Sequence, residues 1–154
     1  MKLTTKQKGN IAELAIAADL AKRGFTVALP YGEYGDWDLL VDRHWAQWTG
    51  MHGKFERVQV KYAALVNGCV PVRNRCHSVT AGRVRSTYSY NDRVDWVAVY
   101  EPTTDQCYYI HNSALTGELL TLRVNPTLKK HSGIRWAKDY TDTINLDATK
   151  QEAI

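Results

Sequence analysis

The spacing of apolar residues changes along the chain, and it first predicts a helix over residues 5–23. Thr4 and Asn10 are both candidate N-caps, because short polar side chains accept hydrogen bonds from the first backbone N–H groups of a helix. Gly24 is placed to end this helix, since glycine readily adopts the left-handed backbone that follows many helices. The chain therefore begins with one helix that has an apolar face.

The segments after this helix are shorter, and several have the period of a strand. Apolar runs predict strands at 25–30, 38–42, 54–65, 69–75, 95–102 and 106–112, the last two forming a hairpin. Pro71 makes its segment an edge strand, because proline cannot donate to a neighbouring strand. Short helices are expected at 80–90 and 112–120, with a turn of helix near Trp136. The order predicts an α/β or α+β sandwich with a mixed β-sheet flanked by helices.

Length, charge and composition narrow the class of protein. The chain has 154 residues, no internal repeat and no linker, so we expect one domain over 1–154, with a basic C-terminal segment from about 123. A net charge of +4 is compatible with a polyanionic partner. Glu13 and Asp19 interrupt the apolar run 11–21, which is too short and too charged to span a membrane. Three cysteines without zinc-type spacing suit a reducing compartment. We expect a cytoplasmic protein with no membrane partner.

Glu13 is unusual for its position in the predicted helix. Its neighbours along the helical row are Ile16, Ala17 and Leu20, so the carboxylate lies near the middle of the apolar face. A charge there is costly unless a partner compensates for it. One interpretation makes Asn10 and Glu13 a capping box that serves only the backbone. The other directs Glu13 into an active site under the sheet.

An aspartate and a lysine stand on two predicted strands that follow one another. Asp38 opens the first strand, and Gln59 and Lys61 share one face of the second, because side chains alternate along a strand. If the strands pair, these side chains meet at one end of a sheet face, and we expect the helix to pack on that face and bring Glu13 within reach.

Phosphodiester hydrolysis needs such a set of side chains. It uses hard oxygen ligands for a divalent metal and a cation that stabilises the negative charge of the transition state. The candidate metal ligands are Asp38, Glu13 and the backbone carbonyl of Val60, and Lys61 would meet the phosphate or the attacking water. The alternative is a structural salt bridge between Asp38 and Lys61.

Basic residues gather in a stretch without acids, residues 62–91. Arginine with aromatic residues nearby suits phosphates and base edges. The candidate DNA contacts, including a second basic group near the C-terminus, are Arg73, Arg75, Arg83, Arg85, Lys129, Lys130 and Arg135. Arg73 and Arg75 alternate on one predicted strand, so they share a face and suit a β-ribbon in the major groove. The alternatives are an edge strand protected by charge and a solvated basic tail.

Several segments resemble a known nuclease superfamily. The stretches "KGNIAELAIAADLAKRGFTVALP", "YGDWDLLVD" and "RVQVK" are similar to PD-(D/E)XK nucleases of the restriction-endonuclease-like fold. The opening helix with its glutamate also resembles archaeal Holliday junction resolvases. The stretches "DWVAVYEPTTDQCYYI" and "LRVNPTLKKHSGIRWAKDY" resemble the downstream part of group I intron-encoded homing endonucleases of this superfamily. The resemblance spans about residues 6–140.

This resemblance implies roles for individual residues. Asp38 stands at the motif aspartate, with Trp37 where proline is frequent, and Lys61 stands at the motif lysine. Asp36 competes with Asp38 for the first of these roles. Gln59 stands where the family usually has Glu or Asp, which removes one anionic metal ligand and leaves open whether one or two metals bind.

The same resemblance implies the reaction and its partners. It implies magnesium-dependent cleavage of double-stranded DNA, with Mn²⁺ as an alternative metal, by a homo-oligomer on a long, roughly palindromic site. A symmetric target favours a dimer or a tetramer. We therefore expect a sequence-specific homing endonuclease. The alternatives are a type II restriction enzyme, a Holliday junction resolvase, and a non-catalytic DNA-binding module in which Gln59 is the inactivating change.

Overall fold

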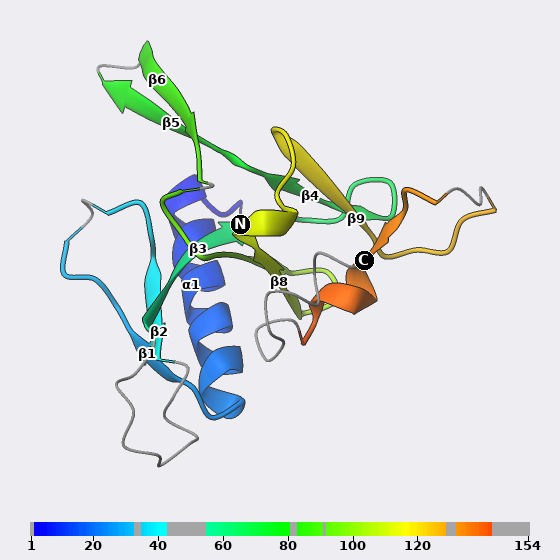
Figure 1. Cartoon of the computed structure of the whole chain (residues 1–154), viewed down its shortest axis with the longest axis horizontal. Coiled ribbons are helices and arrows are strands. Elements are labelled where there is room, and N and C mark those ends of the chain that lie inside the picture. Colours follow the sequence, from blue (N-terminus) through cyan, green and yellow to red (C-terminus); the bar gives the residue numbers. More distant parts are fainter. Residues whose placement is uncertain are drawn as a thin grey trace.

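The computed structural model describes residues 2–32, 35–42, 55–80, 83–90, 92–128 and 132–142. These residues form one helix, a five-stranded sheet, a three-stranded sheet and a two-stranded hairpin (Figure 1). The hairpin, β5 (Arg75–Thr80) with β6 (Arg83–Ser89), projects away from the other elements and is called the arm below. The predicted α+β fold with a mixed sheet is confirmed. Within the described ranges, no helix is both long and apolar enough to cross a lipid bilayer.

The opening helix, α1 (Thr5–Lys22), lies within one residue of its predicted bounds. Its N-cap is Thr4, whose hydroxyl accepts a hydrogen bond from the backbone N–H of Gln7 at 3.2 Å. The Gln7 side chain accepts the backbone N–H of Thr4 in return, at 2.8 Å, which completes a capping box. The interpretation of Asn10 and Glu13 as a capping box is therefore excluded, because Asn10 lies inside the helix. Gly24 follows the helix with φ +89°, as predicted.

The larger sheet has the strand order β1-β2-β3-β7-β8. Its strands are β1 (Thr26–Ala28), β2 (Leu39–Asp42), β3 (Phe55–Tyr62), β7 (Trp96–Glu101) and β8 (Gln106–His111). β3 and β7 run parallel and the other neighbours run antiparallel, so the sheet is mixed. The predicted hairpin of the last two strands is confirmed. β2 pairs directly with β3, which is the pairing on which the predicted site depends.

The smaller sheet has the order β10-β9-β4. Its strands are β10 (Arg135–Trp136), β9 (Leu119–Arg123) and β4 (Cys69–Arg73). β4 is an edge strand, as Pro71 predicts. The expected turn of helix near Trp136 is the 3₁₀ turn η2 (Ala137–Tyr140).

Both short helices expected in the middle of the chain are wrong. The segment 80–90 contains β6, which pairs antiparallel with β5. Its β-branched and aromatic residues favour a strand once a partner strand is adjacent. The segment 112–120 contains only the 3₁₀ turn η1 (Asn112–Ala114) before β9 begins. The 3₁₀ turn ends at its C-cap Leu115, whose ψ of 85° is not helical, and Gly117, with φ +74°, then lies in the left-handed region before β9.

The two faces of the larger sheet are buried against different elements. On one face, Ile16 and Leu20 of α1 are fully buried against Val58 and Val60 of β3. On the other face, Val97 and Val99 of β7 belong to a second apolar cluster. Members of this cluster from the smaller sheet are Val70, Val72, Leu120 and Leu122. Gln59 and Lys61 alternate with Val58 and Val60 along β3, so they face away from α1.

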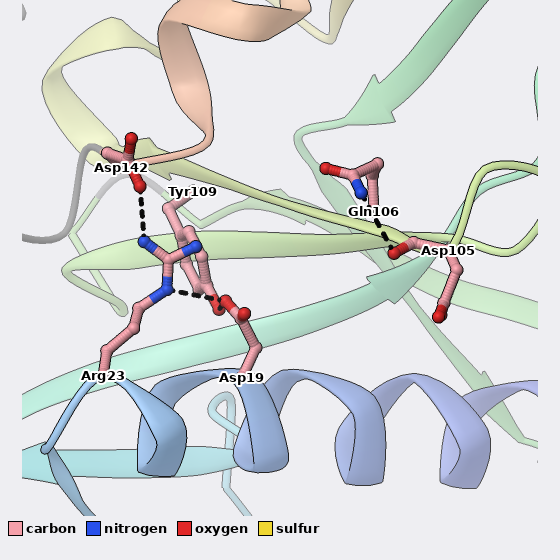
Figure 2. Close-up of polar contacts among 6 residues, drawn as sticks. All are labelled: Asp19, Arg23, Asp105, Gln106, Tyr109 and Asp142. Carbon is pink, nitrogen blue, oxygen red and sulfur yellow. Dashed lines mark hydrogen bonds and ion pairs between the residues drawn. The ribbon is translucent and has the colours of Figure 1, made fainter.

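A polar cluster fixes the C-terminal end of α1 (Figure 2). The carboxylate of Asp19 accepts hydrogen bonds from the Tyr109 hydroxyl and, at 2.9 Å, from Nε of Arg23. The Arg23 guanidinium also pairs with Asp142 at 2.7 Å and lies 5.4 Å from the Tyr109 ring. Burial and the carboxylate of Asp19 raise the pKa of Tyr109. These contacts join the helix to β8 and to the segment after η2.

Candidate active site

Asp38 is fixed to β3 by its backbone and by its side chain. Its N–H donates to the carbonyl of Val58 at 2.9 Å. Its Oδ2 atom accepts the N–H of Val60 at 2.7 Å and a short hydrogen bond from the side-chain amide of Gln59. Within the described parts of the chain, both hydrogen bonds to this carboxylate end on Oδ2, which leaves Oδ1 for another ligand.

The electrostatics of Asp38 favour a cation beside it. Burial raises the pKa of Asp38, and the hydrogen bond from Val60, the charge of Lys61 and the amide of Gln59 oppose this rise only in part. The ionised carboxylate is therefore incompletely compensated by the protein itself. A bound metal ion would supply the missing positive charge.

Lys61 is held by a residue that the sequence did not single out. Its Nζ atom donates to the hydroxyl of Tyr90 at 2.8 Å and lies 4.6 Å from the centre of the Tyr90 ring. Tyr90 follows the last residue of β6 and is 1% exposed. No spacing rule relates it to Lys61, because the two residues meet only after the arm returns to the sheet.

Glu13 approaches Asp38 from a different side than expected. Because α1 packs on the Val58 and Val60 face of β3, Glu13 lies across the sheet from Gln59 and Lys61. The prediction that the helix packs on the polar face is therefore wrong. Glu13 and Asp38 nevertheless line the same cavity of about 500 Å³. That cavity lies between the N-terminal half of α1 and the segment that leads into β2, and further lining residues are Asn10, Pro30 and Trp37.

These groups fit a hard divalent cation. The candidate ligand oxygens belong to the Asp38 carboxylate, the Glu13 carboxylate and the Val60 carbonyl. The Val60 carbonyl also accepts a hydrogen bond of 3.3 Å from the side-chain amide of Gln59. Among the residues that the structure describes, no group of three or more His, Cys, Asp or Glu side chains gathers to hold a metal. The candidate ligands are thus two carboxylates and one carbonyl, and the Gln59 amide stands where the resemblance implies an acid.

Asp36, the alternative candidate for the role of Asp38, makes a different contact. Its Oδ2 atom pairs with Nη1 of Arg93 at 2.7 Å. This ion pair joins the segment before β2 to the segment between β6 and β7. Asp38 is the aspartate that contacts Val60 and Gln59, so the geometry favours Asp38 at the cavity.

The candidate DNA-binding arginines lie on and around the arm. Arg73 ends β4 and is exposed, whereas Arg75 begins β5 and pairs with Glu118. The strand predicted to carry both is interrupted at Asn74, so Arg73 and Arg75 lie on two strands instead of one, and both are exposed on either side of the buried Asn74. Arg83 and Arg85 belong to β6 of the arm (Figure 1).

The second basic group is described only in part. Arg135 lies on β10, and its Nη2 atom donates to the hydroxyl of Thr116 at 3.3 Å. Lys129 and Lys130 lie outside the described residues.

Comparison with known proteins agrees with this architecture. The structure is similar to that of a bacterial homing endonuclease, I-Ssp6803I, with a TM-score of 0.73 and 24% sequence identity. The match covers 98% of this chain and 97% of that chain, and at this identity it establishes the fold. The protein therefore has a restriction-endonuclease-like α+β fold. No curated protein sequence matches the chain at a significant level.

A family model shows to which protein family the chain belongs. The model for the PD-(D/E)XK endonucleases matches residues 3–143. The chain belongs to the PD-(D/E)XK endonuclease family, whose members hydrolyse phosphodiester bonds and typically depend on a metal ion.

Proposed function

We propose that this endonuclease is a homing endonuclease that cuts double-stranded DNA at a specific site with Mg²⁺, and with Mn²⁺ as an alternative metal. The observation that carries the proposal is the meeting of Asp38 and Glu13 at one cavity, with the positive charge of Lys61 close enough to act on Asp38. The similarity to a homing endonuclease over almost the whole of both chains supports the homing assignment.

The candidate site residues would divide the work of hydrolysis between them. Oδ1 of Asp38, the carboxylate of Glu13 and the carbonyl of Val60 would hold the metal ion, directly or through water. The ion, when bound, supplies Lewis-acid chemistry at the scissile phosphate. Lys61 would donate hydrogen bonds to a phosphate oxygen and stabilise the charge that develops there. Gln59 would keep Oδ2 of Asp38 oriented and would hydrogen-bond the attacking water.

The arm suits DNA recognition. A two-stranded ribbon fits the major groove of B-form DNA, and it can approach bases while the cavity approaches the backbone. The arginines of the arm, Arg75, Arg83 and Arg85, would contact phosphates or base edges, together with Arg73 at its base. Lys129, Lys130 and Arg135 would add phosphate contacts. A palindromic target would be bound by a homo-oligomer, either a dimer or a tetramer.

Cleavage of a randomised DNA library tests this function. With Mg²⁺ the wild-type protein should produce cuts at one long consensus, and with EDTA it should bind without cutting. Lys61→Ala should abolish cutting and retain binding, because the lysine acts on the transition state. Random cutting, or full activity of Lys61→Ala, would contradict the proposal. A short consensus of restriction type would retain the nuclease site and refute the homing assignment.

A further inference from the structure

Two buried residues fix the base of the arm, one directly before its first strand and one directly after its second strand. Asn74 precedes the first residue of β5, Tyr90 follows the last residue of β6, and each is 1% exposed. Oδ1 of Asn74 accepts the backbone N–H of Tyr90 at 3.3 Å. The first pair of the arm, Arg75 with Ser89, lies directly beyond this hydrogen bond. Asn74 and Tyr90 together are called the root of the arm below.

The root is also attached to the segment that leads into β9 of the smaller sheet. The side-chain amide of Asn74 donates to the carbonyl of Gly117 at 3.1 Å, and its backbone N–H donates to the carbonyl of Glu118 at 2.9 Å. A buried asparagine that satisfies its donors and its acceptor in this way fixes the backbone on both sides of it. The path of both arm strands is therefore set where they leave the sheets.

The same root contacts the candidate catalytic lysine. The Tyr90 ring packs in the apolar cluster with Val97 and Val99, while its hydroxyl receives the hydrogen bond from Nζ of Lys61. A lysine has a long, flexible side chain and a strongly hydrated ammonium, so it samples many positions unless an acceptor fixes it. Tyr90 supplies this acceptor from a side chain whose own ring is immobilised by burial.

We propose that Tyr90 is a positioning residue for Lys61. Because Asn74 fixes the backbone of Tyr90, the position of Lys61 is tied to the path of the two arm strands. This inference rests on the function proposed above. Tyr90 itself does not touch DNA in this role. Its hydroxyl holds the ammonium beside Asp38, and the Asn74 hydrogen bond sets where that hydroxyl stands. The site and the arm are thus joined through one hydrogen-bonded chain of three residues.

Tyr90→Phe isolates this role from packing. The substitution keeps the buried ring and the backbone N–H that Asn74 accepts, and it removes the hydroxyl that accepts the hydrogen bond from Lys61. Tyr100→Phe is the matched control, because it removes a tyrosine hydroxyl that donates to Asp105 at 2.9 Å on the exposed surface. Both variants should unfold within a few degrees of the wild type.

Two readouts are measured on each variant. The first is the single-turnover cleavage rate at saturating DNA, together with the dissociation constant for DNA. For Tyr90→Phe we expect a loss of about tenfold in rate, which is about 1.4 kcal/mol of activation free energy, with little change in affinity. The second is the rate at which an amine-reactive reagent acylates Lys61 without DNA, followed by mass spectrometry with Lys8 as internal reference. Lys61 should react severalfold faster in Tyr90→Phe, and Tyr100→Phe should match the wild type in both readouts.

The outcomes separate this inference from the proposed function. If the wild type cuts DNA and Tyr90→Phe has an unchanged rate and unchanged Lys61 acylation, the positioning role is overturned and the nuclease assignment stands. If the wild type cuts no DNA while Lys61 acylation rises in Tyr90→Phe, the contact holds the lysine and the proposed function fails. Asn74→Ser tests the root: faster acylation of Lys61 supports the link to the arm, and an unchanged acylation rate refutes it.

Discussion

Asp38→Asn separates the stability of the site from its ability to bind metal. The amide is nearly isosteric with the carboxylate and keeps an oxygen that can accept the N–H of Val60. Because burial raises the pKa of Asp38 in the folded chain, the ionised form destabilises the folded state at neutral pH relative to a neutral group. Without metal we therefore expect the variant to be at least as stable as the wild type, with a Tm equal to that of the wild type or slightly above it.

Saturating Mg²⁺ should reverse this order. A ligand present at about 100 times its Kd stabilises the folded state by about 2.7 kcal/mol. That free energy corresponds to a rise in Tm of roughly 5–10 °C for the wild type. Asp38→Asn, which lacks the anionic oxygen, should show little or no rise. The assay is a thermal melt with EDTA and with Mg²⁺, in the absence of DNA.

Asp36→Asn is the control for this experiment. Asp36 pairs with Arg93 instead of Val60 and Gln59, so its replacement should leave the response to Mg²⁺ unchanged. A full response in Asp38→Asn together with a lost response in Asp36→Asn would refute our assignment of the metal-binding aspartate. A wild-type protein whose Tm does not respond to Mg²⁺ or Mn²⁺ would refute the metal site itself.

Three further predictions concern residues other than Asp38. Ile16→Ala, at a fully buried position, should cost about 2–5 kcal/mol in urea denaturation, and Leu14→Ala, at a 69% exposed position, less than about 0.5 kcal/mol. Burial would raise the pKa of Asp95, but hydrogen bonds from Arg57 and its charge lower it overall. Asp95→Asn should therefore be less stable than the wild type at pH 7, and urea midpoints should converge as the pH falls below about 4. Gln59→Glu should lower the Tm in EDTA, because two carboxylates then adjoin, and should enlarge the rise with Mg²⁺.

The contact between Asp38 and β3 was predictable because it depends on the pairing of two neighbouring strands and on side-chain alternation. Once β2 pairs with β3, a residue just before β2 must lie beside the middle of β3, and Leu39 indeed pairs with Val58. Side-chain alternation then puts Gln59 and Lys61 on one face. The side from which Glu13 approaches was not predictable, because helical periodicity identifies an apolar face but does not say which face of a sheet will cover it.

The arm and its root were not predicted, because they too depend on contacts between segments that are separate in the sequence. A short segment such as 80–90 has no strong period of its own, and it becomes a strand only because 75–80 folds back beside it. The local pattern predicts one continuous strand through Asn74, because nothing in it marks Asn74 as the point where the chain leaves one sheet for the arm. The contact of Tyr90 with Lys61 is tertiary, and it joins residues 29 positions apart.

The alternation along β3 explains how one strand can serve both the core and the chemistry. Val58 and Val60 are covered by α1 and hold the sheet together, whereas Gln59 and Lys61 on the opposite face contact Asp38 and Tyr90. The backbone joins the two roles, because the N–H of Val60 holds Asp38 while its side chain packs in the core. Polar substitutions at Gln59 or Lys61 should therefore leave the packing of α1 intact and act on the contacts with Asp38 and Tyr90, whereas a cavity at Val60 would disturb both the core and the placement of Asp38.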